Sequence, residues 1–260
     1  MTEIVIQGIG GRMGHVLCDM IAQREDCCVV AGIDMKDGEQ NGIPVYDSLE
    51  KLNGKGDVII DFSSPAAVEK ALPYCQTHKL PIVVCTTGLS EELQLKVVQL
   101  SRSVPVFKSA NMSMGINVLS ELCKRASAIL GANYDIEIVE QHHHNKLDAP
   151  SGTAITLAEG ILEKIDRKDK WVKGTFLAPD GTISGTNDCA PNELPISSIR
   201  EGEVFGLHTI RYESDVDTIS ITHDAKSRGG FVLGAVLAAE YTATHEGFLG
   251  MSDLFPFLND

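Results

Sequence analysis

The chain lacks any long hydrophobic run: its apolar stretches all fall well short of the ~20 residues that a membrane-spanning helix requires. Its first residues, MTEIVIQGIGG, also lack the basic region and the long apolar core of a secretory signal peptide. We therefore expect no membrane partner and a cytoplasmic location.

Positive charge is also scarce. There are 22 Lys and Arg residues against 36 Asp and Glu residues, which gives a formal net charge of -14. Because non-specific binding to nucleic acid depends on a basic surface, we expect no nucleic-acid partner. An anionic ligand must instead be bound by a local basic cluster, and the run HHHNK at residues 142–146 is the obvious candidate.

The seven cysteines form no C-x-x-C motif, and their number is odd. Most lie within apolar runs, as expected for buried, reduced thiols. A zinc site could use two of the clustered histidines, but the chain has neither H-E-x-x-H nor a cysteine pair at ligand spacing. It also lacks the G-x-S-x-G motif of serine hydrolases. We therefore expect neither a bound metal nor a serine nucleophile.

Short apolar segments alternate with helical patterns over the first 112 residues. We expect buried strands at EIVIQG, CCVVAGID, DVIIDF, PIVVCTTG and VPVFKSA. Such alternation predicts a Rossmann-like, doubly wound parallel sheet with helices on both faces. The sequence thus indicates an α/β protein whose residues 1–112 form a dinucleotide-binding domain.

The pattern changes beyond residue 112. A long helical segment and the alternating segments YDIEIVEQHHH, GLHTIRYES and DTISITH predict a second α+β domain, residues 113–225, with a mixed and largely open-faced sheet. The polar, glycine-rich stretch from Asp166 to Asn192 is expected to be a loop or a mobile excursion. The last apolar helix, GGFVLGAVLAAEYTATH, could belong to either domain.

The segment GIGGRMG joins the first strand to the first helix. It places Gly8, Gly11 and Gly14 at a G-x-x-G-x-x-G spacing, and Asp34 ends the second strand. Glycines permit a tight turn and a close approach of the backbone to a pyrophosphate, while the helix N-terminus favours that anion. A carboxylate at the position of Asp34 is expected to receive the adenosine ribose hydroxyls. A tight turn without a ligand is the alternative interpretation.

The choice between NADH and NADPH stays open at this point. Asp34 favours NADH because a carboxylate repels a 2′-phosphate, whereas Lys36 and Arg12 could pair with that phosphate. The strand ends DFSSP and CTTG lie at the carboxyl edge of the predicted sheet, where ligands bind in such folds. Their candidate cofactor contacts, which could also be ordinary loop residues, are Phe62, Thr86, Thr87 and Gly88.

The histidine cluster lies at the end of a predicted strand. Successive strand side chains point to opposite faces, so His142 and His144 are expected to share one face and His143 to take the other. Ser151 is a good N-cap for the following helix, which places the amides of Gly152 and Thr153 in the first helical turn, where an anion can bind. With Lys146 nearby, these residues predict a carboxylate site beside a histidine that donates a proton near neutral pH. A histidine-rich strand of structural importance only is the alternative.

These segments resemble the 4-hydroxy-tetrahydrodipicolinate reductase (dihydrodipicolinate reductase) family. The run EIVEQHHHNKLDAPSGTA is similar to the family's histidine–lysine signature. Further similar segments follow in the family's order, namely GIGGRMG, DFSSP, CTTG, SANMSMGIN, SIREGEVFGLHT and ITHDAKSRGGFVLGAV. The resemblance covers nearly the whole chain. It implies reduction by NADH or NADPH of a small cyclic dicarboxylate, 4-hydroxy-tetrahydrodipicolinate, with loss of water, on the route to diaminopimelate and lysine.

The resemblance also implies roles for individual residues. His142 matches the proton donor and Lys146 its cationic assistant, while His143, Lys146, Gly152 and Thr153 match residues around the two substrate carboxylates. Cofactor contacts match Gly8, Gly11, Arg12, Met13, Asp34, Gly88, Ala110, Asn111 and Met112, together with Arg228 and Phe231 near the C-terminus. The last two imply that residues 226–260 pack back on the first domain. Members of the family are typically homotetramers.

Two positions depart from the family's pattern. Some members have an acid followed directly by arginine where this chain reads Asp34-Met35-Lys36, which puts the 2′-phosphate clamp in doubt. Met112 stands where some members have an aromatic residue. Two other functions are compatible with parts of the sequence: a different Rossmann-type oxidoreductase that acts on a small dicarboxylate, and a non-catalytic nucleotide sensor. The HHHNK cluster argues against the sensor, which would not need a proton donor.

Overall fold

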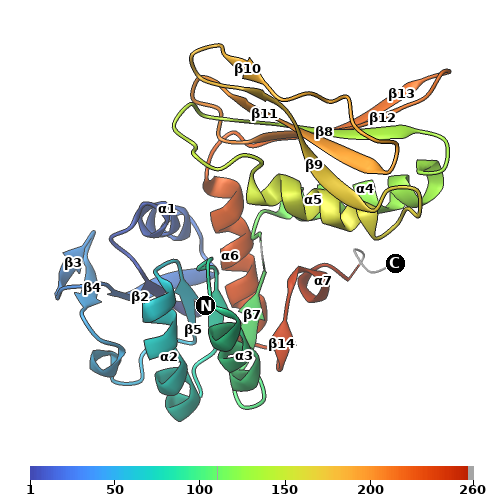
Figure 1. Ribbon diagram of the computed structural model, residues 1–260. Coiled ribbons are helices and arrows are strands. Elements are labelled where there is room, and N and C mark those ends of the chain that lie inside the picture. Colours follow the sequence, from blue (N-terminus) through green and yellow to red (C-terminus); the bar gives the residue numbers. More distant parts are fainter. Residues whose placement is uncertain (110, 257–260) are drawn as a thin grey trace. The chain divides into compact units, whose positions relative to one another are not determined.

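Two separate sheets, each with its own hydrophobic core, organise residues 1–109 and 111–256, the part of the chain that this computed structural model describes. The first sheet belongs to a unit made of residues 1–113 and the segment from Arg228 onward, and the second to a unit spanning Met114–Ser227. The predicted fold class, a doubly wound parallel sheet plus a second α+β domain, is confirmed (Figure 1). Within the described residues, no helix is both long and apolar enough to cross a membrane.

The first sheet has the order β14-β7-β6-β5-β1-β2-β4-β3 within the described residues. All neighbouring pairs run parallel except β3 with β4. The strands are β1 (Thr2–Gln7), β2 (Cys27–Ile33), β3 (Gly38–Gln40), β4 (Ile43–Tyr46), β5 (Val58–Asp61), β6 (Ile82–Val84), β7 (Val106–Lys108) and β14 (Phe248–Leu249). The chain leaves β1 towards β2 and later returns to β5 on the other side of β1. In sheets of this kind ligands bind at such a reversal, which here lies at the carboxyl ends of β1 and β5.

Helices cover both faces of this sheet (Figure 1). They are α1 (Arg12–Ile21), η1 (Leu49–Leu52), α2 (Pro65–His78), α3 (Glu91–Leu100), α6 (Gly229–Thr242) and α7 (Met251–Leu254). Ile4 and Ile6 of β1 point into the core that contains α1 and α6, whereas Val5 points into the core that contains α2 and α3. Because both faces are buried, the strand reads as a continuous apolar run. The last helix, α6, belongs to this first unit.

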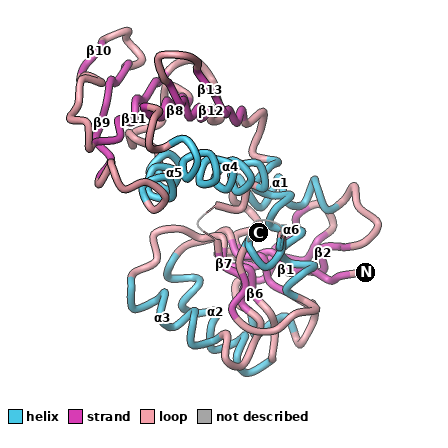
Figure 2. Tube along the Cα trace, turned by 90° about the vertical axis from the view of Figure 1, so that its right-hand side faces the viewer, coloured by secondary structure: helices cyan, strands magenta, loops and turns pink. Residues whose placement is uncertain are grey.

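The second sheet has the order β10-β9-β11-β8-β12-β13 and mixes parallel with antiparallel pairs. Its strands are β8 (Asp135–His142), β9 (Lys170–Leu177), β10 (Ile183–Ser184), β11 (Glu193–Arg200), β12 (Leu207–Glu213) and β13 (Thr218–Asp224). The helices α4 (Met114–Leu130) and α5 (Gly152–Leu162) lie side by side along one face (Figure 2). The opposite face carries the half-buried side chains Glu137, Val139 and Gln141 of β8.

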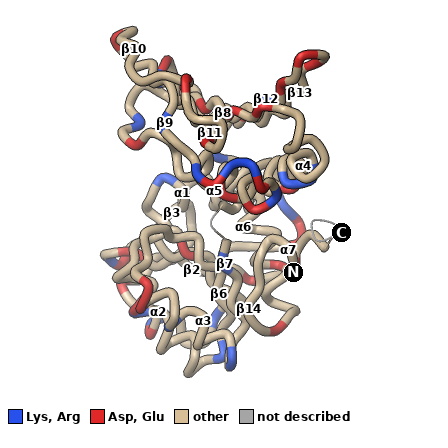
Figure 3. Tube along the Cα trace, turned by 45° about the vertical axis from the view of Figure 1, so that its right-hand side comes forward, with Lys and Arg blue, Asp and Glu red and all other residues tan. Residues whose placement is uncertain are grey.

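One expectation for the second unit is wrong. The stretch from Asp166 to Asn192 contains β9 and β10 instead of being only a loop. β9 pairs in parallel with β11 and is stabilised by hydrogen bonds to that strand. The polar sequence of β9 alone does not predict a strand, because pairing with a distant segment decides its structure. A separate feature of this unit is the acidic turn that joins β12 and β13 (Figure 3), where the sequence has Glu213, Asp215 and Asp217.

Candidate active site

The glycine turn after β1 is shaped by close backbone contacts. Gly8 has a φ of +84°, and a Cβ there would lie 2.5 Å from the carbonyl oxygen of Phe62. A Cβ on Gly14 would lie 2.2 Å from the carbonyl oxygen of Ile9. Both contacts exclude a side chain, so glycine is required for the turn to pass this close to the end of β5 and to the first turn of α1.

The N-terminus of α1 suits a pyrophosphate. Gly11 is its N-cap, and no side chain in the described structure caps the first turn, which holds Arg12 and Met13. The amides of such an uncapped turn lack intrahelical partners and can bind an anion. The residues present therefore fit a dinucleotide.

Asp34 occupies the position expected for a ribose-binding carboxylate. Its Oδ2 accepts a hydrogen bond of 2.8 Å from the Gly10 amide, and its Oδ1 accepts one of 2.7 Å from the Met35 amide. The carboxylate is thus held at the glycine turn and keeps further lone pairs for a ligand. Lys36 and Arg12 are exposed, and neither forms an ion pair with Asp34 in the described structure.

The other predicted cofactor residues lie in segments that follow β5, β6 and β7 or open α6. Phe62 follows β5; Thr86, Thr87 and Gly88 follow β6; Asn111 and Met112 follow β7; Arg228 and Phe231 lie at the start of α6. Met112 is buried in the core of the unit, and its carbonyl oxygen would lie 1.8 Å from a Cβ on Gly234, so α6 needs glycine there. Ala110 lies outside the described residues.

A buried polar group that sequence reasoning missed lies beneath this edge of the sheet. Asp61, the last residue of β5, is fully buried and accepts a hydrogen bond from the Ser63 hydroxyl. Burial raises the pKa of Asp61, although hydrogen bonds from Ser63 and Thr86 partly oppose the shift. Its Oδ2 and the Oε1 of Gln7 are buried and have no hydrogen-bond partner among the described residues.

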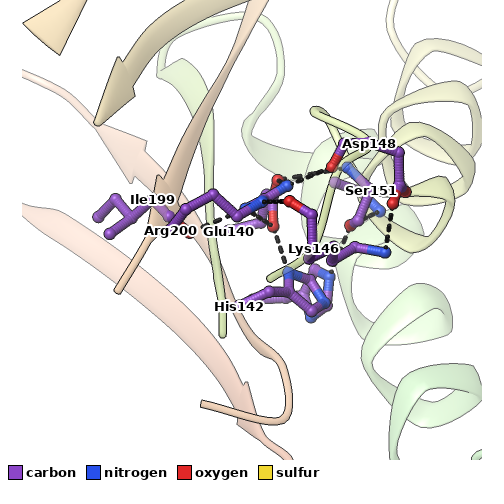
Figure 4. Close-up of polar contacts among 9 residues, drawn as sticks. Glu140, His142, Lys146, Asp148, Ser151, Ile199 and Arg200 are labelled. Carbon is purple, nitrogen blue, oxygen red and sulfur yellow. Dashed lines mark hydrogen bonds and ion pairs between the residues drawn. The ribbon is translucent and has the colours of Figure 1, made fainter. Parts of the chain in front are cut away.

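In the second unit, His142 is buried at the end of β8. Its Nδ1 is hydrogen-bonded to Oε2 of Glu140 (Figure 4). The two residues lie two positions apart on one strand, so their side chains share a face. β8 ends at His142, so the prediction that His142 and His144 share a strand face is wrong. His144 is exposed, with Nδ1 lying 2.9 Å from the carbonyl oxygen of Gly202, and His143 is half-buried.

Arg200 completes this buried group from the neighbouring strand. It lies opposite His142 in the parallel register of β11 and β8, and it is 1% exposed. Its Nη2 donates to Oε1 of Glu140 over 2.7 Å, and its Nη1 donates to Oε2 over 3.0 Å. Burial alone would raise the pKa of Glu140, but hydrogen bonds from His142 and Arg200 outweigh it and lower that pKa to about 2. Glu140 therefore stays ionised although it is fully buried.

A second buried histidine borders the group from the other side. His208 of β12 pairs in register with Glu140, and its ring meets that of His142 edge to face at 5.2 Å. Burial, followed by the charge of His142, lowers the pKa of His208 to about 3. Its Nε2 lies 3.2 Å from Oγ of Ser151. His208 is therefore neutral near pH 7.

The residues expected to bind an anion follow along the chain, and Ser151 is the first of them to contact the buried histidines. Ser151 caps α5, because its Oγ accepts a hydrogen bond of 3.2 Å from the Ala154 amide. Gly152 is exposed and has no atom within 4 Å of a notional Cβ, and Thr153 follows it in the first turn. Lys146 directs Nζ to Oδ1 of Asp148 at 2.9 Å, and that side chain of Asp148 is 61% exposed. An incoming carboxylate can therefore compete with Asp148 for the lysine.

Glu140, His142 and His208 lie close enough to hold a metal ion. Their hydrogen bonds argue for another use, because Arg200 already occupies both oxygens of Glu140 and its positive charge repels a cation. The group is a hydrogen-bonded network, not a set of free ligands.

Sequence reasoning missed Glu140, Arg200 and His208. The spacing of two between Glu140 and His142 could have placed Glu140 on the same strand face. Arg200 and His208 join the group only through the register of β11 and β12 with β8, and that register cannot be predicted from the sequence alone.

The parallel sheet with its glycine turn and the second sheet with its histidine site define the class of two-domain, Rossmann-type oxidoreductases. Residues 2–112 match the family model described as dihydrodipicolinate reductase, N-terminus, and residues 115–255 match dihydrodipicolinate reductase, C-terminus. The chain belongs to the dihydrodipicolinate reductase family.

Individual relatives agree with this membership. A protein of Clostridium novyi (strain NT) named 4-hydroxy-tetrahydrodipicolinate reductase is 37% identical over 260 residues, covering 100% of both chains. Another of that name, from Caldanaerobacter subterraneus subsp. tengcongensis, is 38% identical over 255 residues, 98% of each chain. A solved structure of dipicolinate-bound dihydrodipicolinate reductase from Paenisporosarcina sp. TG-14 shares the fold, with a TM-score of 0.82 at 24% identity over 98% of this chain and 99% of that one.

Proposed function

We propose that this protein reduces 4-hydroxy-tetrahydrodipicolinate to tetrahydrodipicolinate, with loss of water, at the expense of NADH or NADPH, in the biosynthesis of diaminopimelate and lysine. The observation that carries the proposal is the placement of His142 at the end of β8, near the N-terminus of α5 and the Lys146 loop, in a chain of this family. That placement suits a substrate that carries two carboxylates and must receive a proton.

His142 is the proton donor in this proposal. The neighbouring histidine, His208, has a pKa lowered to about 3 by its burial and is therefore neutral at working pH. Lys146 and the first-turn residues Gly152 and Thr153 bind the substrate carboxylates through an ammonium and the backbone amides at the N-terminus of α5. His143, half-buried beside them, supports the same anionic group.

The first unit binds the nicotinamide cofactor, which when bound supplies the hydride. Gly8, Gly11, Arg12, Met13 and Gly14 hold the pyrophosphate at the N-terminus of α1. The remaining proposed contacts at the carboxyl edge of the sheet are Asp34, Lys36, Phe62, Thr86, Thr87, Gly88, Ala110, Asn111, Met112, Arg228 and Phe231. For Met112, whose side chain is buried in the core, the contact falls to the backbone.

Both cofactors are accepted in this proposal. The carboxylate of Asp34 is pre-positioned by two backbone amides and suits ribose hydroxyls, while Arg12 and Lys36 are exposed and suit a 2′-phosphate. Asp34→Ala is expected to weaken NADH binding more than NADPH binding, as measured by fluorescence titration of each cofactor. A larger loss for NADPH would contradict the assignment of Asp34 to the ribose.

We further propose a cytoplasmic homotetramer. The face of the second sheet that α4 and α5 do not cover, with its half-buried Glu137, Val139 and Gln141, supports an interface there. The domains proposed from the sequence are residues 1–112 with 226–260, and residues 113–225. Analytical ultracentrifugation tests the assembly, and a monomer at micromolar concentration would contradict it.

The function is tested by following NADH and NADPH absorbance while an upstream condensing enzyme supplies the substrate from aspartate semialdehyde and pyruvate. We expect cofactor consumption that requires all three components. His142→Gln is expected to lower turnover by on the order of 10²–10⁴-fold, the usual contribution of a general acid. Unchanged turnover in the variant would remove His142 from the mechanism, and no consumption by the wild type would refute the function.

A further inference from the structure

We infer that Glu140 and Arg200 are positioning residues for the reaction: Glu140 fixes which nitrogen of His142 carries the transferable proton, and Arg200 ties that carboxylate to the loop that carries Lys146. The inference rests on the proposed function in one respect, namely that His142 is the proton donor. Both residues lie in segments that resemble the family, but neither is among the residues that received a role from the sequence, and both are almost completely buried.

The sheet register brings the group together. Glu140 lies two residues before His142 on β8, Arg200 of β11 is the register partner of His142, and His208 of β12 is the register partner of Glu140. The whole group therefore lies on one face of the sheet, as the labelled side chains in Figure 4 show for Glu140, His142 and Arg200. No loop rearrangement is needed to assemble it.

The tautomer of His142 follows from the charge of its partner. An ionised carboxylate can only accept hydrogen bonds, and the pKa of Glu140 is lowered to about 2 by His142 and Arg200 against the effect of burial. Nδ1 of His142 must therefore carry a hydrogen and donate it to Oε2 of Glu140. In the neutral ring Nε2 is then the free base, and in the protonated ring Nε2 holds the proton that can leave.

The surroundings of Nε2 agree with this use. A Cβ on Gly206 would lie 3.1 Å from Nε2 of His142, so glycine at that position leaves the nitrogen uncrowded. The hydrogen bond that the ring of His142 makes within the described residues uses Nδ1 and leaves Nε2 out. The nitrogen left for a substrate is thus the one that does not face Glu140.

Arg200 extends the same hydrogen bonding to the substrate-binding loop. Besides its two bonds to Glu140, it donates from Nη2 to the carbonyl oxygen of Asp148 over 2.6 Å and from Nε to that of Lys146 over 3.3 Å. One rigid guanidinium thereby fixes the carboxylate beside His142 and the backbone of the lysine loop. A lysine at 200 could balance the charge but could not reach all of these acceptors in their fixed directions.

The first test measures the tautomer directly. Nitrogen-15 NMR of the histidine rings in the ligand-free full chain, with His142→Gln used for assignment, is expected to show a protonated Nδ1 and an unprotonated Nε2 in neutral His142. Glu140→Gln is expected to disturb this state, because a glutamine amide can donate to Nδ1. An Nε2-protonated ring in the wild type would overturn the inference whether or not the enzyme reduces the proposed substrate.

The second test separates positioning from stability. Glu140→Gln is expected to lower kcat by on the order of 10²–10⁴-fold, as for other carboxylates that orient a catalytic histidine, with KM changed only a few-fold. Removing Glu140 alone also leaves the charge of Arg200 buried without a partner, which lowers stability. The single variant Glu140→Gln is therefore compared with the double variant Glu140→Gln/Arg200→Met. The double variant is expected to regain thermal stability but not kcat; recovery of kcat along with stability would reduce Glu140 to a structural role.

A matched control uses a Glu–Arg pair on the surface of α4. Glu121 accepts from Nε of Arg125 over 2.9 Å, and Glu121→Gln makes the same chemical change away from the site. Its kcat and its histidine spectrum are expected to match the wild type. If this variant lost as much kcat as Glu140→Gln, the effect would not be specific to the carboxylate at His142. If the wild type failed to turn over the substrate while its NMR spectrum showed the expected tautomer, the proposed function would fail and the positioning of His142 by Glu140 would stand.

Discussion

Among the described residues, each of the two units buries one carboxyl group near the carboxyl end of a strand, and the pKa values of the two groups shift in opposite directions. Glu140 in the second unit is fully buried and has Arg200 and His142 as partners. Its pKa is lowered to about 2, because these hydrogen bonds outweigh burial. Asp61 in the first unit is equally buried but is bonded by hydroxyl groups, and burial raises its pKa.

The difference shows that burial does not decide the charge of a carboxyl group; the partner does. A guanidinium in bidentate contact keeps Glu140 ionised, so it can hold an imidazole. Neutral hydroxyls do not offset the desolvation of Asp61, so the fold favours its protonated form. The ionised group lies beside the proposed proton donor, and the group that favours protonation lies under the proposed cofactor edge.

The largest expected effect comes from removing the cation of the charged group. Arg200→Met leaves Glu140 buried without its partner, which is expected to lower the free energy of unfolding by ~3–5 kcal/mol. Denaturant titration at pH 7 measures the loss. Arg125→Met is the control, because it breaks a surface pair with Glu121 whose side chains are 46% and 25% exposed, and its cost is expected to stay within about 0.5 kcal/mol. Equal costs would show that the Glu140–Arg200 pair contributes no more than a surface pair.

The second largest effect is expected from lowering the pH, which should reduce the stability of the second unit. The folded pKa of His208 is lowered to about 3 by burial, and that of Glu140 to about 2 by its partners. Both values lie below those of the unfolded chain, so the stabilisation is present above the unfolded pKa values and is lost as pH falls towards the folded ones. Each group should contribute on the order of 2–3 kcal/mol.

The free energy of unfolding, measured from pH 7 down to pH 3, is therefore expected to fall first from His208 and then from Glu140. His208→Gln should flatten the upper part of this curve, because glutamine does not titrate. An unchanged slope between pH 6.5 and pH 4.5 in that variant would contradict the low pKa of His208.

The smallest effect is expected at Asp61, and it has the opposite sign. Because its folded pKa is raised above the unfolded value of ~3.9, stability is present below that value and is lost as pH rises through the folded pKa. Asp61→Asn cannot ionise and offers an amide donor to Gln7, its register partner on β1.

At pH 7 the free energy of unfolding of the variant should therefore be at least that of the wild type, with a gain of up to about 1 kcal/mol. The gain should disappear below pH 4. Thermal unfolding at the two pH values checks this. A loss at pH 7 comparable to that of Arg200→Met would mean that Asp61 is ionised and that its charge is needed.

The sequence predicts the first unit more fully than the second. Uninterrupted apolar strands and the Gly8–Gly14 turn announce a parallel sheet, since strands buried on both faces leave little room for polar residues. β9 escaped prediction because its lysines and Gly174 break the apolar pattern, and it is held by pairing with β11. Strand pairing between distant segments is not written in local composition.

The same limit applies to the site. His142, Lys146 and the capping Ser151 lie in one run of sequence, so their shared chemistry can be inferred from spacing. Arg200 and His208 join the site only through strand register. Asp61 looks like an ordinary strand-ending acid, because the sequence does not show that the described structure gives it hydroxyl partners and no cation.

The central claim, hydride transfer to a dicarboxylate protonated by His142, is tested most directly with a nicotinamide deuterated at the transferred position. The account predicts that mass spectrometry finds one deuterium per molecule of tetrahydrodipicolinate formed by the wild type, and that His142→Gln forms the same labelled product more slowly by on the order of 10²–10⁴-fold. Cofactor oxidation without label in that product, or formation of the product at an equal rate by both proteins, would contradict it.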